Sequence, residues 1–404
     1  MMRAGLATVE ITPPPNVPLD GFETRKTGSQ GVHDPLFARA IVLDDGTTRI
    51  AWLIADLVGM PAATTATIRT EGACRAGTTG DRIMVSSTHT HGGPSPHPVP
   101  GVEADHAAHA RWLEALPAAL GVALGDAAAA LEPAEILHGR TACTEVQHNR
   151  RFHMKDGGIR MVWDNPDPAD VARLGPVDPE VQVIEIRRAG RPRGVIAQFA
   201  CHATAVTGGN FLVTADWPGV AVRELERISG DQGLWVAVAQ GCCGDITPTP
   251  PRGTFEVCEA KGSIVAHAMM RALVGATPVR SAPLAAARVP VRLPRKIAGP
   301  DPSPAGGFYE GEVQVFRIGD LAIVGLPGEP FVEIGLRIKA LPGFRGIFVG
   351  GYTNDYDDAE LGYIPTSGEY GGGYEPTASR VAPGADDLLV SAAREALSRL
   401  NERR

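Results

Sequence analysis

The sequence lacks the features that mark nucleic-acid-binding and membrane proteins. Its 404 residues carry 38 Lys and Arg against 46 Asp and Glu, a net charge of −8, and there is no basic run. This balance excludes the electrostatic footprint of a nucleic-acid binder. No stretch reaches the ~20 apolar residues that span a bilayer, and the start of the chain has no apolar signal-peptide core. We therefore expect a cytoplasmic protein without a transmembrane segment.

Cysteine and aromatic residues are also sparse. The six cysteines show no spacing typical of a zinc ribbon or a disulfide framework, so we expect them to be reduced. Aromatic residues make up only 5 % of the chain, and no amphipathic segment indicates binding to a membrane surface. By contrast, 48 Gly and 34 Pro indicate many tight turns and loops, where catalytic residues concentrate.

Strand and helix patterns alternate along the whole chain, without a linker or an internal repeat. The expected hairpins pair Phe37–Leu43 with Arg49–Ala55, and Val181–Arg187 with Gly194–Phe199. The expected helices cover residues 64–75, 103–131 with a break at Pro117, 218–229, 255–273, about 331–340 and 385–402. This interleaving predicts a mixed α/β (α+β) protein with a large mixed sheet flanked by helices, in a single domain over residues 1–404.

The sharpest local feature is a His-x-His motif at the end of a predicted strand. The run Thr88-His89-Thr90-His91-Gly92-Gly93-Pro94 follows the strand at Arg82–Ser87. Residues i and i+2 of a strand point to one face, so the two imidazoles are expected to lie together. Neutral imidazole is the commonest metal ligand, but a bare His-x-His fits a pair of surface histidines equally well. A metal site therefore needs further partners.

Candidate partners follow other predicted strands. His202 comes directly after the apolar run Val195–Ala200, and Glu329 comes after Leu321–Leu326. Five of the six tyrosines fall between Tyr352 and Tyr374, in a glycine-rich stretch. Taken singly, each has an ordinary explanation: His202 as a core histidine, Glu329 as a carboxylate at a helix start, and the tyrosines as part of a surface loop.

Taken together, these blocks resemble the neutral/alkaline (non-lysosomal) ceramidases, which are zinc amidohydrolases of sphingolipid and lipid metabolism that cleave the N-acyl bond of ceramide. The resemblance runs from Gly5 to about Gly384. Its blocks are Gly5-Leu6-Ala7-Thr8-Val9-Glu10-Ile11-Thr12-Pro13, Pro18-Leu19-Asp20-Gly21-Phe22, the stretch from Gly31 to Ala40, the His-x-His motif, His202 with Thr214-Ala215-Asp216, Gly244-Asp245-Ile246-Thr247-Pro248, Leu326-Pro327-Gly328-Glu329, Asn354-Asp355-Tyr356 and Gly362-Tyr363-Ile364-Pro365-Thr366.

The resemblance implies a set of site residues. By it, Zn²⁺ is held by His89, His202, Glu329 and Tyr363. His91 corresponds to a hydrogen-bond donor or proton shuttle, and Gly21 to a glycine whose backbone lines the site. Arg150 and Tyr374 correspond to residues that contact the substrate and take part in catalysis, although Tyr374 follows Tyr363 one residue sooner than the family pattern has it. Such a metal lowers the pKa of a bound water and polarises the scissile carbonyl.

The chain departs from the ceramidase pattern in two respects. The family's active-site serine is replaced by Thr247, whose β-branch crowds its hydroxyl. We therefore favour attack by metal-activated water, with Thr247 as a hydrogen-bond donor, over attack by Thr247 itself. Cys242 and Cys243 are interpreted as small buried residues rather than nucleophiles. As a second departure, we expect the protein to lack the signal peptide and the C-terminal immunoglobulin-like domain of better-known members.

The chain is therefore predicted to be a zinc-dependent hydrolase of an amide bond, with a small-molecule N-acyl substrate that need not be a lipid. One alternative is a zinc-dependent esterase or lactonase, because the same activated water attacks any polarised acyl group. A second is a non-catalytic metal-binding protein of the same fold, against which the presence of all four ligand types argues. The sequence gives no indication of the oligomeric state.

Overall fold

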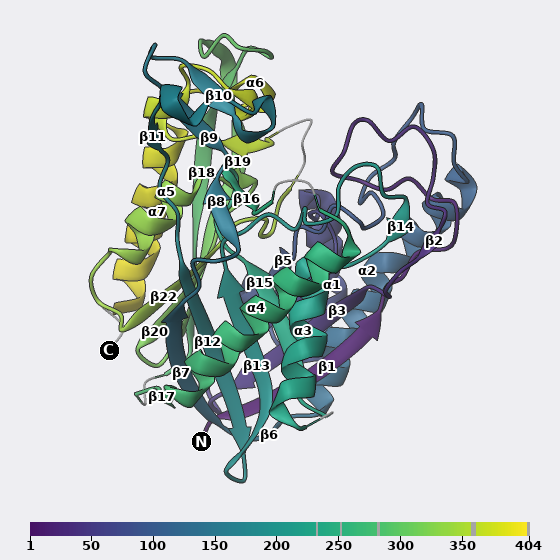
Figure 1. Ribbon diagram of the computed structural model, residues 1–404. Coiled ribbons are helices and arrows are strands. Elements are labelled where there is room, and N and C mark those ends of the chain that lie inside the picture. Colours follow the sequence, from purple (N-terminus) through teal and green to yellow (C-terminus); the bar gives the residue numbers. More distant parts are fainter. Residues whose placement is uncertain (232, 251–252, 281–282, 357–360, 402–404) are drawn as a thin grey trace.

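The computed structural model describes residues 1–404 apart from 232, 251–252, 281–282, 357–360 and 402–404. Its longer strands form three sheets, ordered β5-β4-β3-β1-β6, β15-β13-β12-β7-β17 and β18-β19-β20-β22. Helices pack on the outer side of each sheet (Figure 1). The mixed α/β class is confirmed, and the strands expected in one large sheet are divided among several.

The same order of elements occurs three times along the chain. Each unit has three antiparallel strands, a helix, a fourth strand parallel to the third, and a second helix. The first unit consists of β1 (Arg3–Glu10), β3 (Phe37–Asp44), β4 (Arg49–Ala55), α1 (Ala62–Ala76), β5 (Ile83–Ser87) and α2 (His106–Ala129). The second consists of β7 (Glu135–Ala142), β12 (Glu180–Arg188), β13 (Arg191–Phe199), α3 (Asp216–Ser229), β15 (Trp235–Gln240) and α4 (Phe255–Val274). The third consists of β18 (Ala285–Lys296), β19 (Pro304–Ile318), β20 (Leu321–Gly325), α5 (Val332–Lys339), β22 (Gly346–Gly350) and α7 (Ala385–Asn401).

The first two units also agree in detail. In each, a two-residue strand ending in proline, β6 (Glu132–Pro133) or β17 (Thr277–Pro278), pairs with the unit's first strand. A Cβ on Gly5 would lie 1.7 Å from the carbonyl oxygen of Ala127 in α2, and one on Gly139 would lie 1.9 Å from that of Ala272 in α4. Both glycines thus let the second helix approach the first strand closely. The expectation of no internal repeat was wrong, because the repeat lies in element order and a few spacings rather than in residue identity.

One apolar cluster joins the inner faces of the three sheets. Each sheet contributes large side chains to it, including Ile41, Trp52, Ile184, Ile196, Phe316 and Phe348. Each of the other clusters joins one sheet to its own helices. Because apolar burial favours the folded state in proportion to area, this shared core fixes the three sheets against one another.

The three sheets bring the carboxyl ends of their parallel strands to one place. Isolated bridges pair Ser86 with Thr353, Thr90 with Ala203, and Gly241 with Gly350. These positions lie at or just beyond the ends of β5, β13, β15 and β22. The loops that leave these strands therefore meet, which is the usual place for a site in folds with parallel strands.

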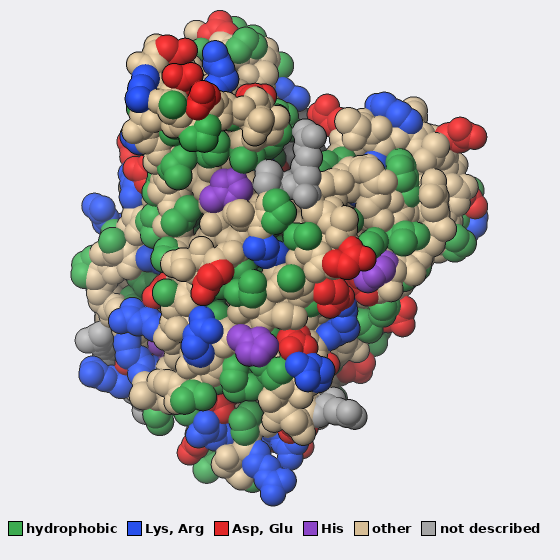
Figure 2. Space-filling view, viewed as in Figure 1, with side chains coloured by type: hydrophobic (Ala, Val, Ile, Leu, Met, Phe, Trp, Pro, Cys, Tyr) green, Lys and Arg blue, Asp and Glu red, His purple; other side chains and the backbone are tan. Residues whose placement is uncertain are grey.

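Shorter elements form two lobes above this point (Figure 1). One lobe holds β8 (Gln147–Asn149), β9 (Arg151–Met154), η2 (Val162–Asp164), η3 (Pro168–Asp170), η4 (Ser367–Glu369), α6 (Tyr374–Ala378), β10 (Ile159–Met161) and β11 (Val171–Leu174). The other holds the long loops around β2 (Gly31–Val32) and β14 (Leu212–Val213). The remaining short elements are η1 (Gly80–Arg82), β16 (Ile246–Pro248), β21 (Glu329–Pro330) and β23 (Tyr363–Ile364). Figure 2 shows the surface hollowed between the lobes.

The element predictions hold for both hairpins, but the strands β1 and β7 were not predicted, and the structure differs in two further places. Helix α2 runs through Pro117 without a break, since proline removes only one intrahelical hydrogen bond and Leu116 and Leu120 are buried on either side. The long strands β18 and β19 were not predicted. Among the described residues, α2 is the one helix whose length and composition would allow it to cross a membrane. It packs against α1, β1 and β3.

Candidate active site

His89 lies just beyond β5, where the chain turns sharply. Its φ is +59°, a left-handed value that is uncommon for a residue other than glycine and is often found at functional sites. The turn brings His91 Nε2 to 3.1 Å from His89 Nε2. The two rings meet as predicted, but the expected reason was wrong: the turn brings them together, not a shared face of an extended strand.

The ring orientation of His89 is fixed by the backbone. Its Nδ1 lies 2.6 Å from the carbonyl oxygen of Val58, which can only accept a hydrogen bond. Nδ1 therefore carries a proton, and Nε2 is the ring nitrogen that faces the rest of the site. A ligating histidine is usually oriented in this way.

His202 follows β13 and is oriented by the same device. Its Nδ1 lies 2.6 Å from the carbonyl oxygen of Cys243 and 2.9 Å from that of Ile246. Burial, together with the nearby charge of Arg150, lowers the pKa of His202 to about 4. The imidazole is therefore neutral at physiological pH and presents its Nε2 lone pair.

Glu329 brings a carboxylate to both nitrogens. Its Oε2 lies 3.3 Å from His89 Nε2 and 3.1 Å from His202 Nε2. Tyr356 donates to Oε1 at 3.2 Å, and the Tyr352 hydroxyl lies 3.5 Å from Oε2. Burial alone would raise the pKa of Glu329, but the imidazoles of His89 and His202 hold it well below its usual range. The group is an ionised carboxylate.

This arrangement fits a metal ion. The Nε2 atoms of His89 and His202 converge on one carboxylate oxygen at 3.1–3.3 Å. When both rings carry their proton on Nδ1 only, this geometry brings two lone pairs against a carboxylate, which is unfavourable unless a cation lies among them. Ligands about 2.0 Å from a tetrahedral zinc are spaced by roughly 3.3 Å, as here. The side-chain nitrogens of His89, His91 and His202 also lie within 4.8 Å of one another.

His91 differs from the other two histidines. Its Nδ1 is buried and has no hydrogen-bond partner among the described residues, so nothing orients the ring as a ligand. A Cβ on Gly21 would lie 2.3 Å from Cγ and Nδ1 of His91, so the glycine backbone packs directly on this ring. His91 and Gly21 both line the pocket described below.

Tyr363 pairs with Glu329 in the short parallel sheet of β21 and β23. Burial and the Glu329 carboxylate raise the pKa of the Tyr363 phenol well above its usual value. The guanidinium carbon of Arg150 lies 5.4 Å from the Tyr363 ring centroid and opposes that shift. A cation beside the oxygen would lower the pKa further, as a phenolate ligand requires.

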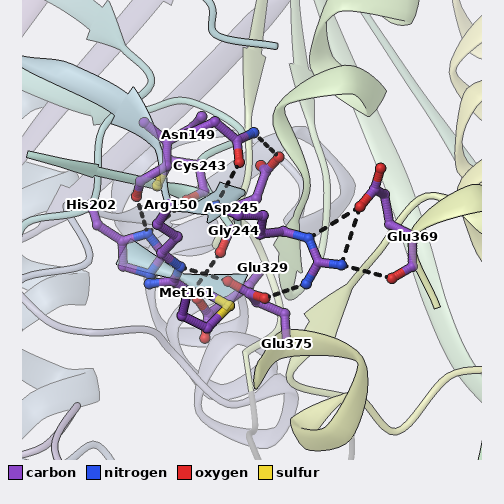
Figure 3. Close-up of polar contacts among 12 residues, drawn as sticks. Asn149, Arg150, Met161, His202, Cys243, Gly244, Asp245, Glu329, Glu369 and Glu375 are labelled. Atoms are coloured by element: carbon purple, nitrogen blue, oxygen red, sulfur yellow. Dashed lines mark hydrogen bonds and ion pairs between the residues drawn. The ribbon is translucent and has the colours of Figure 1, made fainter. Parts of the chain in front are cut away.

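Arg150 is held in a buried ionic network (Figure 3). Its Nε donates to Glu375 at 2.6 Å and its Nη2 to the Gly244 carbonyl at 2.7 Å. Arg151 donates to the other oxygen of Glu375, also at 2.6 Å. Asn149 donates to Asp245 at 2.6 Å. The network joins β8 to α6 and to the loop whose carbonyls orient His202.

A pocket of about 570 Å³ opens beside this centre, between the two lobes. Its lining includes five of the predicted site residues, namely Gly21, His91, Glu329, Tyr363 and Tyr374. Tyr374 is 44 % exposed, and its ring centroid lies 5.6 Å from that of Tyr363. Arg150 and Thr247 do not belong to the lining. Thr247 is buried in β16, one residue after the Ile246 carbonyl that contacts His202.

Sequence reasoning gave no role to two residues that complete the centre, Tyr352 and Glu375. Tyr352 stacks on His89 with ring centroids 3.8 Å apart, and its hydroxyl lies 3.1 Å from Cys243 Sγ. Glu375 is the buried carboxylate between two arginines. The concentration of tyrosines signalled Tyr352. Nothing local signalled Glu375, whose partner Arg150 lies 225 residues away.

Fold and site together define a mixed α/β protein with a buried cluster of histidine and carboxylate groups that is compatible with a metal. A family model described as neutral/alkaline non-lysosomal ceramidase, N-terminal, matches residues 2–288. The chain belongs to this family, whose activity is the hydrolysis of N-acyl amide bonds.

Curated and solved relatives agree with this assignment. The neutral ceramidase of Mycobacterium tuberculosis is 24 % identical over 87 % of this chain and 69 % of its own length. That of Pseudomonas aeruginosa is 24 % identical over 91 % of this chain and 67 % of its own length. The crystal structure of the latter enzyme covers 100 % of this chain and 75 % of its own with a TM-score of 0.83 at 20 % identity. A ceramidase complexed with C2 gives 0.81 at 19 %. At this identity, the structural likeness shows the fold.

Proposed function

We propose that this protein is a zinc-dependent hydrolase that cleaves amide bonds in small N-acyl compounds. The observation that carries the proposal is the orientation of His89 and His202 by backbone carbonyls. It directs both Nε2 atoms at one carboxylate oxygen of Glu329 with tetrahedral spacing. Tyr363, paired with Glu329, would complete the ligand set.

When bound, zinc would polarise the acyl carbonyl and lower the pKa of a water molecule. The other groups then divide the remaining work. His91 lines the pocket, and its Nδ1 has no hydrogen-bond partner among the described residues, which suits the ring to hold or pass a proton at the amide nitrogen. Arg150 lies behind Tyr363 and favours the phenolate form of that residue. Thr247 would supply a hydroxyl that orients the substrate or donates to the developing negative charge.

The proposed substrate is a small N-acyl compound, lipid or not. Curated relatives are named neutral ceramidases, which supports an N-acyl amide as the scissile group. The 570 Å³ pocket is of the size that encloses a small molecule. Its lining mixes apolar residues such as Leu19 and Phe22 with charged ones such as Asp20 and Arg25.

Metal content and turnover of matched variants test the assignment. We expect the zinc-loaded protein to hold one ion per chain and to release amine from a panel of N-acyl amines. His202→Ala should lose both metal and turnover. His91→Ala should keep the metal and lose rate by roughly 10²–10⁴-fold.

A His202→Ala protein with one tightly bound zinc and full turnover would overturn the ligand assignment. A His91→Ala protein without metal would make His91 a ligand instead. Ester analogues of the same acyl groups, assayed side by side, decide whether amides are the better substrates.

A further inference from the structure

We propose that the pocket contains a carboxylate-binding subsite built on Arg380, so that the preferred substrates are N-acyl compounds with a free carboxylate. This inference rests on the proposed amide hydrolysis and narrows its substrate class. Hydrolysis adds one water across the C–N bond and releases an acid and an amine, and the substrate's free carboxylate takes no part in that step.

Arg380 is held firmly by its backbone. Its N–H donates to the Leu361 carbonyl at 3.3 Å, and its own carbonyl accepts from Lys296 N–H at 3.0 Å. The residue follows α6, the helix that carries Tyr374, and lines the same pocket as Glu329 and Tyr363. A guanidinium attached to so fixed a backbone is well placed for a ligand in that pocket.

The Arg380 guanidinium has donors to spare. The side chain is partly buried, yet among the described residues no carboxylate forms an ion pair with it and no side-chain hydrogen bond occupies it. The arginines of the neighbouring network, Arg150 and Arg151, by contrast each donate to the carboxylate of Glu375. A planar fork of unused N–H donors matches a carboxylate, which accepts two parallel hydrogen bonds.

The charge around the pocket also favours an anion. Arg25 is buried, and its guanidinium donates only to the backbone carbonyls of Asp20, His91 and Asn210. Burial lowers its pKa to about 10, so it stays protonated at neutral pH. Lys26, the third cation of the lining, is exposed.

Carboxylates do not cancel these three cations once a metal is bound. The lining holds Asp20, Glu23 and Glu329. Glu329 belongs to the candidate metal centre, where a divalent ion would more than offset it. With Tyr363 as the phenolate ligand proposed above, the described lining of a loaded pocket would carry a net positive charge of about one, which a carboxylate on the substrate would neutralise.

The carboxylate could sit on either half of the substrate. On the amine half, the compound is an N-acyl amino acid. On the acyl half, it is a monoamide of a dicarboxylic acid. Both present the same anion to Arg380, and assays with N-acetyl amino acids and with N-succinyl amines separate them.

Kinetics on pairs of substrates that share a shape and differ in charge test the subsite. Each carboxylate substrate is compared with its primary carboxamide, which has the same shape and no charge. We expect the zinc-loaded wild type to prefer the carboxylate, and Arg380→Gln to lose at least roughly tenfold in kcat/KM on it, mostly through KM, with little change on the carboxamide. Arg191→Gln, at an exposed position outside the pocket, should match the wild type on both.

A charge reversal and a binding measurement make the test independent of folding and turnover. Arg380→Glu should invert the preference, favouring substrates with an ammonium group in place of the carboxylate. Calorimetry of the metal-free protein should show binding of the carboxylate compounds to the wild type and its loss in Arg380→Gln.

If the wild type cleaves carboxamides with the same kcat/KM as carboxylates, the subsite proposal is wrong while the hydrolase proposal stands. If no amide is cleaved but the carboxylates bind through Arg380, the hydrolase proposal fails and the subsite stands. Equal binding of the carboxylates by wild type and Arg380→Gln would sink the subsite in either case.

Discussion

Glu375 offers the sharpest test of how the active-site arginine is held. The side chain is fully buried, and each carboxylate oxygen accepts one arginine at 2.6 Å. Glu375→Gln keeps the shape but removes the negative charge, and its amide N–H₂ must face one of the two guanidinium groups. Two buried cations then share one carbonyl oxygen.

The cost can be worked out from this geometry. Removing one partner of a buried ion pair typically costs 3–5 kcal/mol because the other charge stays buried and uncompensated. Arg151 retains Glu369 and two backbone carbonyls, and Arg150 retains the Gly244 carbonyl, so the lower end applies. We expect the free energy of unfolding to fall by about 3 kcal/mol. Because Arg150 loses its Nε anchor, kcat/KM should fall on the order of 10- to 100-fold.

Glu369→Gln is the matched control. Its side chain is 17 % exposed, it pairs with Arg151 and His153, and it does not contact Arg150. Its loss should cost about 1 kcal/mol or less and leave turnover nearly unchanged. Urea unfolding and steady-state kinetics of the two variants decide the matter. If Glu375→Gln lies within about 0.5 kcal/mol of the wild type and keeps full activity, the network does not position Arg150.

Three further predictions address the metal, the threonine and the glycine. Zinc should raise the melting temperature of the wild type and leave that of His202→Ala unchanged, the stabilisation reaching about 4 kcal/mol at a thousandfold excess over Kd; an equal rise in both would contradict the ligand set. Thr247→Val should lose roughly 10²–10³ in rate but stay active, and Thr247→Ser should equal or exceed the wild type; mass spectrometry that finds an acyl adduct on the Thr247 peptide would replace water with the threonine as nucleophile. Gly21→Ala should keep its metal and lose at least about tenfold in kcat, because the new Cβ would meet the His91 ring at 2.3 Å and the residue has φ +86°; an unimpaired variant would show that the His91 position is not critical.

Strand ends were predictable from the sequence because their signals are local. Apolar runs that stop at His202 or shortly before Glu329 placed these residues beyond strands, as the structure has them. The family resemblance then grouped them with His89 and Tyr363. The structure brings these residues together, although their roles still depend on the experiments above.

Features that depend on tertiary context were not predictable. The left-handed turn at His89 is held by the contact of its ring with Val58, which sequence patterns do not show. Helix α2 keeps Pro117 because core packing on both sides outweighs one lost hydrogen bond. The pairing of Arg150 with Glu375 joins segments that lie 225 residues apart in the chain and meet in one lobe. None of these has a signal within a window of neighbouring residues.

Each of the three units supplies one residue to the candidate metal centre, because His89, His202 and Glu329 come from different units. No single unit, expressed alone, would contain the centre. His202 and Glu329 lie 127 residues apart along the chain, so an ion bound by both would close a long loop. Closing this loop reduces the conformational entropy of the unfolded chain far more than that of the folded protein. Metal binding and the packing of the three units against one another are then coupled in a single equilibrium. Metal affinity would then report on the integrity of the whole fold, and a cut in the chain between units would weaken it without touching any ligand.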